Sequence, residues 1–323
     1  VKMFRCLPFV ALTSCWTTLS IRALSTPIPK QAQDGWTDVA IQTAKGFTIS
    51  QRKKLFEEGA MDNKPWPIQI LGKPSHLWDS SFQKENPTAK LIHFQRHGQG
   101  YHNLICDMWR ELNRPIDFDS SDPTLNPLLR SEVIDPPLTH SGILQCQARR
   151  HQCSQLNPKL VVISPLTRCL QTAKISFRDH TRLLVDIPWI AHEGCREELG
   201  LLMGNKRRTK VELEEDFPDI DFSHLTDNQD SLWEHYHHHN QGQQQQQHHH
   251  RETLSEQSHR AYQFMTEFIQ RRPETEIAVV CHSAYLFTLW NSVMDIEDES
   301  LQSWPLTSEV RSLIVQFSPG PKE

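Results

Sequence analysis

The sequence predicts an α/β fold, a three-layer α/β/α sandwich in which helices cover both faces of a mixed, mostly parallel sheet. Three short apolar segments carry this prediction, and each is bounded by polar residues: 90–95, 159–163 and 276–281. Segments with helical periodicity lie between them, and strands that alternate with helices are typical of this architecture. Ligands of such folds bind beyond the carboxyl ends of the strands, so the residues that follow each strand are the first functional candidates.

Composition narrows the class of protein. The chain of 323 residues can hold one large domain or two small ones, and its 23% charged and 37% hydrophobic residues fit a globular protein. A net charge of -5 argues against a nucleic-acid partner. The eight cysteines lack the spacing of a metal site or of a disulfide framework, so we predict no metal, although one or two bridges would suit an exported protein.

The first 25 residues resemble a targeting peptide. Lys2 and Arg5 precede an apolar stretch over 7–21, and small residues follow it. A secretory signal and an organelle transit peptide both fit, and a buried first helix is the alternative. The stretch is too short and too polar to predict stable membrane insertion after processing. Val1 is not an initiator, so a start at Met3 and a cytoplasmic location are expected if this end is a gene-model artefact.

The remaining elements follow in order. We expect an irregular lead-in over 26–87 with weak helical periodicity at 46–61, and then a catalytic domain over 88–320. Its further helices are predicted at 102–112, from Thr139 or Ser141 to about 156, and at 167–177, 254–271 and 285–294. Further strands are predicted at 185–193 and 310–317. A Pro/Asp/Ser-rich loop covers 114–137.

A low-complexity tract of His and Gln interrupts the domain at 235–251. Such a composition cannot bury enough apolar surface to order itself, so the tract is predicted to be a disordered insertion. Clustered histidines also bind transition metals, which makes a metal buffer the weaker alternative.

Cations and imidazoles follow the three apolar strands. Arg96-His97 ends the first, Arg168 begins the helix after the second, and His282 follows the third. Together they predict a positive pocket at one end of the sheet, suited to phosphate oxygens that guanidiniums bind bidentately. A histidine there can act as a general base or as a nucleophile that accepts a phosphoryl group. No metal is needed if the arginines stabilise the charge of the transferred group.

Four ordered segments resemble the motifs of the histidine phosphatase superfamily, the phosphoglycerate mutase-like family. They are Arg96-His97-Gly98 with Asn103, the segment 135–145, Ser164-Pro165-Leu166-Thr167-Arg168, and Val279-Val280-Cys281-His282-Ser283. The resemblance covers roughly 91–317 and implies a phosphoglycerate mutase-like fold.

The resemblance also implies the roles of the site residues. His97 would be the phosphorylated nucleophile and His282 the second catalytic histidine. The phosphate would be held by Arg96, Gly98, Asn103, Arg168 and Ser283. The proton donor would be Glu197, with Glu193 and Glu198 as alternatives, and its site should be desolvated so that its pKa is raised.

The predicted activity is hydrolysis of a small-molecule phosphomonoester through phosphohistidine at His97, without a cofactor. Mutase-type phosphoryl transfer and a non-catalytic phosphate-binding protein remain the alternatives. Specificity is expected from the loops 114–137 and 206–222. The basic stretch 206–208 (Lys206, Arg207, Arg208) is either a solvated turn or a sign of a second acidic group on the substrate. The oligomeric state is left open.

Overall fold

A computed structural model describes residues 38–179, 187–238 and 251–320. The chain divides into two units, residues 1–37 and Asp38–Glu323, and only the second is described below. The predicted targeting peptide therefore lies outside the described residues.

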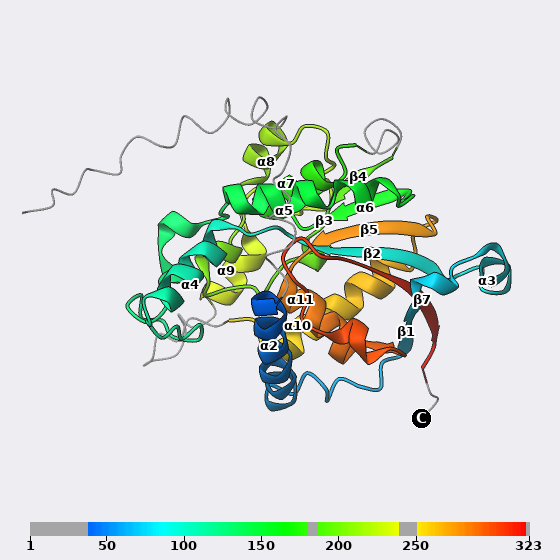
Figure 1. The fold of residues 1–323 in the computed structure, drawn as a ribbon, viewed down its shortest axis with the longest axis horizontal. Helices are drawn as coiled ribbons and strands as arrows, with labels where there is room; N and C mark the ends of the chain where they lie inside the picture. The colour runs from blue at the N-terminus through cyan, green and yellow to red at the C-terminus, as the bar shows by residue number, and fades with distance from the viewer. Residues whose placement is uncertain (1–37, 180–186, 239–250, 321–323) are drawn as a thin grey trace, which may run out of the picture. The chain divides into compact units, whose positions relative to one another are not determined.

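A seven-stranded mixed sheet forms the centre of this unit (Figure 1). In spatial order, the strands are β4 (Trp189–Ala191), β3 (Leu160–Ile163), β5 (Glu276–Cys281), β2 (Lys90–Arg96), β7 (Val310–Pro319), β1 (Ile68–Pro74) and β6 (Met294–Ile296). The first four are mutually parallel, β7 is antiparallel to both β2 and β1, and β6 is parallel to β1. The predicted α/β sandwich with a mostly parallel sheet is confirmed.

Helices cover both faces of the sheet (Figure 1). One face carries α5 (His140–Ala148), α6 (Arg150–Ser154), α7 (Thr167–Ser176) and α8 (Lys210–Asp216). The other carries α2 (Asp38–Glu57), α10 (Leu254–Gln263) and α11 (Ser283–Thr288), and the last two continue as π-helical turns at Phe264–Ile269 and Leu289–Val293. Three helices lie outside these layers: α3 (Ser80–Glu85), α4 (Tyr101–Glu111) and α9 (Ser231–His238).

β5 shows why the central strands read as continuous apolar runs. Its alternate residues Ile277 and Val279 pack into a core with α10 and α11, whereas Ala278 and Val280 pack into a second core with α7. Both faces of the strand are therefore buried, as expected of a parallel strand between helical layers. Each fully buried Val or Ile contributes roughly 1.5–3 kcal/mol to the free energy of unfolding.

Residues 68–74 differ from the irregular lead-in that the sequence suggested. They form β1, which pairs with β7 over seven residues and with β6 over three. Gly72 and Pro74 give this segment little strand propensity of its own. The pairing becomes favourable only between two other strands, where Gly72 also avoids a clash, because a Cβ there would lie 2.8 Å from Ile296 Cγ1.

The His/Gln tract is shorter than predicted at both ends. Residues 235–238 belong to α9, which buried Trp233 anchors, and Arg251 forms ion pairs with Asp119 and Glu198. These contacts come from folded neighbours that composition alone does not reveal. Residues 239–250 lie outside the described residues.

Two further observations bear on the composition. The six cysteines among the described residues are all unpaired and buried: Cys106, Cys146, Cys153, Cys169, Cys195 and Cys281. None of the described helices combines the length and the apolar character that a membrane crossing requires.

Candidate active site

Three strand ends bring His97, Arg168 and His282 together. His97 follows β2, His282 follows β5, and Arg168 lies in the first turn of α7, after β3. The two imidazole rings lie 5.1 Å apart between centroids. Arg168 lies between them, with Nε 3.3 Å from His97 Nε2 and Nη2 3.3 Å from His282 Nδ1. The predicted convergence at the carboxyl edge of the sheet is therefore present in the structure.

The hydrogen bonds of His97 define its tautomer. Nδ1 lies 2.6 Å from the Gly98 carbonyl oxygen, which can only accept, so Nδ1 carries the proton. Nε2 accepts from Arg168 Nε and therefore presents a lone pair. Burial, together with Arg168 and Arg96, holds the pKa of His97 well below its ordinary value. The imidazole is thus neutral near pH 7, as a nucleophile must be.

Arg168 is fully buried and is held by neutral groups. Its Nη1 donates to the Gly204 carbonyl at 2.6 Å and its Nη2 to Asn205 Oδ1 at 3.0 Å. Among the described residues it forms no ion pair with a carboxylate. Burial is the main reason why the pKa of Arg168 is lowered. A buried guanidinium without a counter-ion creates a strong local demand for an anion.

Arg96 adds a second cation with the same deficit. Its Nη1 donates to the Pro305 carbonyl at 2.9 Å, while its Nε is buried without a hydrogen-bond partner. Burial lowers the pKa of Arg96 to about 10, so the side chain remains charged at neutral pH. The unpartnered Nε is a donor that a bound anion would satisfy.

Gly98 and Asn103 shape the turn after β2. A Cβ on Gly98 would lie 2.7 Å from the Gly142 carbonyl oxygen and 2.8 Å from Cys146 Sγ, so only glycine fits this approach to α5. Asn103 Oδ1 accepts from the Gly100 amide at 3.0 Å and caps α4. These contacts give both residues a positioning role, and no bound phosphate is present to show the contacts predicted for them.

Glu197 lies at the start of α11. Its carboxylate accepts from the backbone amides of Ala284 at 3.2 Å and Tyr285 at 3.0 Å. Burial, followed by repulsion from the Glu198 carboxylate, raises the pKa of Glu197 to about 7. A carboxyl group that exchanges its proton near neutral pH is suited to general acid–base catalysis.

The two alternative acids are committed to ion pairs. Glu193 pairs with Arg196 at 2.9 Å and with Arg207 at 2.8 Å, and Glu198 pairs with Arg251. A carboxylate that faces a guanidinium is held ionised and is a poor proton donor. Geometry thus favours Glu197 among the three candidates.

The basic stretch 206–208 is neither a solvated turn nor an open anion site. Arg207 is buried and donates to Glu193 and to three backbone carbonyls. Arg208 pairs with Asp135 and Asp216, and Lys206 pairs with Glu234. Folded partners from distant parts of the chain neutralise the stretch, so the hint of a second acidic group on the substrate loses its basis there.

His282 and Ser283 form the junction between β5 and α11. His282 Nε2 lies 2.7 Å from Ser164 Oγ, and burial is the main cause that holds the pKa of His282 well below its ordinary value. Ser283 is the first residue of α11 and is buried. Backbone amides at this end of a helix favour a negative charge nearby.

Four residues of the site were not singled out in the sequence. Asn205 and Ser164 hold Arg168 and His282, and Thr172 Oγ1 accepts from the Gly98 amide at 3.0 Å. His102 lies 5.4 Å from His97 between ring centroids, and its Nδ1 is buried without a hydrogen-bond partner. Only the adjacency of His102 to Asn103 in the first motif could have indicated its position.

The described residues contain no group of three or more His, Cys, Asp or Glu side chains arranged to hold a metal ion. What converges instead is two guanidiniums, three imidazoles and one carboxyl group with a raised pKa: Arg96, Arg168, His97, His102, His282 and Glu197. This set can bind a phosphate-like anion, attack it with a neutral imidazole and exchange a proton with it.

Comparisons with solved structures find chains of similar architecture. The ecdysone phosphate phosphatase of Bombix mori, in complex with tungstate, has a TM-score of 0.42 and 17% identity, and the alignment covers 72% of this chain and 94% of that one. A phosphoglycerate mutase from Bacillus anthracis has a TM-score of 0.40 and 12% identity, with 72% and 92% covered.

Comparisons of sequence identify the family. A phosphoglycerate mutase-like protein of Arabidopsis thaliana is 31% identical over 230 residues, which cover 63% of this chain and 74% of the relative. Phosphoglycerate mutase-like protein 1 of the same plant is 28% identical over 259 residues, with 70% and 81% covered. The family model of the histidine phosphatase superfamily (branch 1) matches residues 129–322. The chain therefore belongs to the histidine phosphatase superfamily, as the resemblance of its motifs predicted.

Proposed function

We propose that the protein hydrolyses a small-molecule phosphomonoester through a phosphohistidine intermediate on His97. The observation that carries the proposal is the state of His97: a neutral imidazole with Nδ1–H fixed on the Gly98 carbonyl and its Nε2 lone pair beside Arg168. This is the form of histidine that can attack phosphorus.

In the first step, His97 Nε2 forms a bond to phosphorus while the bond from phosphorus to the ester oxygen breaks. Arg168 and Arg96 stabilise the charge on the phosphoryl oxygens, with Arg168 Nε moving its hydrogen bond from His97 to the substrate. Glu197, protonated over the lower part of its titration near pH 7, gives its proton to the leaving oxygen.

In the second step, water attacks the phosphorus of phosphohistidine. The carboxylate of Glu197 takes the proton from water, the bond from phosphorus to Nε2 breaks, and inorganic phosphate leaves. Glu197 thus alternates between acid and base, which a pKa of about 7 permits at neutral pH. The buried cations act in both steps because the same three phosphoryl oxygens remain in the pocket.

Phosphate release by the purified full-length protein tests the proposal over a panel of phosphomonoesters. His97→Ala should abolish release, whereas His151→Ala, which removes an exposed histidine of α6, should retain it. A phosphorylated protein trapped by acid-free quenching in the parent, and absent from His97→Ala, would support the covalent step.

Two outcomes would contradict the proposal. Release that persists in His97→Ala would exclude this nucleophile. Interconversion of phosphoglycerate isomers without net phosphate release would assign mutase-type transfer instead, and esters that bind without any turnover would favour a non-catalytic phosphate-binding protein.

A further inference from the structure

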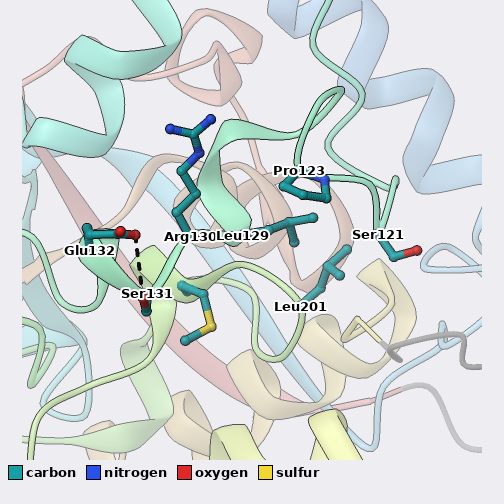
Figure 2. A pocket seen from close by; sticks show the side chains of 8 residues that line it. Ser121, Pro123, Leu129, Arg130, Ser131, Glu132 and Leu201 are labelled. Atoms are coloured by element: carbon teal, nitrogen blue, oxygen red, sulfur yellow. Dashed lines mark hydrogen bonds between the residues drawn. The ribbon is translucent and has the colours of Figure 1, made fainter. Parts of the chain in front are cut away.

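A cavity of about 590 Å³ lies beside the candidate active site (Figure 2). Two segments far apart in the sequence line it, the loop 121–132 and the turn 201–203. The lining side chains are Ser121, Pro123, Leu129, Arg130, Ser131, Glu132, Leu201 and Met203. The mechanism proposed above uses none of them.

The cavity and the phosphate pocket share one wall. Met203 lines the cavity, and the next residue, Gly204, accepts the hydrogen bond of Arg168 Nη1 at 2.6 Å. On the same wall, a Cβ at Gly204 would lie 3.5 Å from His102 Cβ and 3.7 Å from the Val133 carbonyl oxygen. A substrate phosphate at Arg168 would therefore place the remainder of the substrate next to this cavity.

The walls combine an apolar surface with one cation that lacks a partner. Leu129, Leu201 and Met203 supply apolar surface. The Glu132 carboxylate turns to the Ser131 hydroxyl, 3.4 Å away, while the Arg130 guanidinium ends apart from both (Figure 2). Arg130 is exposed, and among the described residues its side chain forms no ion pair or hydrogen bond. A guanidinium above an apolar surface suits an organic group that carries a carboxylate.

We propose that this cavity binds the leaving group of the substrate, and that Arg130 selects leaving groups that combine an apolar ring with a carboxylate. The inference rests on the proposed phosphatase function and extends it to a substrate class. A cavity of about 590 Å³ falls within the range of sites that enclose a whole organic ligand, and it far exceeds the needs of a three-carbon acid.

Two matched esters test the assignment, 4-carboxyphenyl phosphate and its neutral isostere 4-carbamoylphenyl phosphate. The full-length protein should favour the carboxylate ester by about tenfold in kcat/KM, the effect of one charge-assisted contact. Arg130→Gln should reduce that ratio to about one, and Arg130→Lys should retain part of it because lysine keeps the charge but loses the fork of donors. Comparing the ratio between variants cancels the intrinsic difference in reactivity of the two esters.

Arg271→Gln is the matched control, because it removes an exposed arginine next to the amino end of β5, at the opposite edge of the sheet. It should leave the ratio unchanged. A parent ratio of one, or a ratio that Arg130→Gln does not alter, would overturn the inference. If neither ester is hydrolysed, the phosphatase function fails, and equilibrium binding of the same two esters decides on the cavity alone. Preference for the carboxylate that disappears in Arg130→Gln supports it, and equal affinities overturn it.

Discussion

Two sets of buried arginines lie a few residues apart and differ in their partners. Arg196 is fully buried and is bound by both oxygens of Asp230 at 2.7 Å and by Glu193 at 2.9 Å, and its pKa is raised because these carboxylates outweigh the effect of burial. Arg168 is equally buried, contacts only carbonyl, amide and imidazole groups, and has a lowered pKa.

This difference separates structure from function within one positive region. An arginine that the fold itself neutralises holds a loop in place, as Arg196 holds the segment that carries Glu197. An arginine that the fold buries without a counter-ion costs stability, and a ligand anion can offset that cost. The four predictions below test this distinction, beginning with the largest effect.

Arg168→Ala should separate activity from stability. Because Arg168 is placed to stabilise the transferred phosphoryl group, kcat/KM should fall by roughly 10³–10⁵. Its removal leaves no carboxylate unpaired, so the free energy of unfolding should change far less than a lost ion pair would require. Steady-state kinetics and urea denaturation of the same preparation measure both. A large loss of stability with little loss of rate would assign Arg168 to the structural set.

Glu197→Gln should lower kcat by about 10²–10⁴ for esters of poor leaving groups, since an amide cannot supply the proton. In the parent, kcat/KM should decline above pH 7, because the proton is lost as the pH rises through the Glu197 pKa of about 7. This alkaline limb should be absent from the variant. An ester of 4-nitrophenol, which leaves without protonation, should be affected least, and equal losses for all leaving groups would contradict the role of an acid.

Asp230→Ala should produce the reverse of Arg168→Ala. It leaves Arg196 buried with Glu193 alone, so the free energy of unfolding should fall by about 3–5 kcal/mol. Denaturant unfolding measures the change, and Asp219→Ala, at an exposed ion pair with Lys174, is a control that should cost no more than about 1 kcal/mol. Equal costs for the two variants would remove the distinction between buried and exposed pairs.

Inorganic phosphate should stabilise the parent by supplying the missing counter-ion. At a concentration one hundred times its Kd, an anion that binds only the folded state adds about 2.7 kcal/mol to the free energy of unfolding. Thermal denaturation with and without phosphate measures the gain, which Arg168→Ala should lose and Asp219→Ala should keep. Stabilisation that survives in Arg168→Ala would locate the anion elsewhere.

The sequence predicted the parts of the fold that depend on local pattern. The strands that became β2, β3 and β5 are buried on both faces and therefore appear as apolar runs. β1 and β6 were missed because one contains Gly72 and Pro74 and the other has only three residues, so each depends on its neighbours in the sheet. No local pattern could reveal that β7 runs antiparallel between β2 and β1.

The candidate site follows the same division. Arg96, His97, Arg168 and His282 could be predicted because their motifs adjoin strand ends. The separate fates of Arg207 and Arg168 could not, since they depend on whether Glu193 or only neutral groups lie opposite. The choice of Glu197 over its neighbours likewise required the amides of α11 and the ion pairs of Glu193 and Glu198.

The buried cysteines have a consequence for measuring how the fold opens. All six described thiols are shielded, and burial raises the pKa of Cys106 to about 11 and that of Cys153 to about 12. Because the thiolate is the reactive form, alkylating reagents should label these residues only when the surrounding core separates. With Cys6 and Cys15 replaced by serine, the labelling rate of each remaining thiol becomes a residue-resolved measure of opening. Cys169, whose Sγ lies 3.4 Å from His282 Nε2, would report on the active site itself.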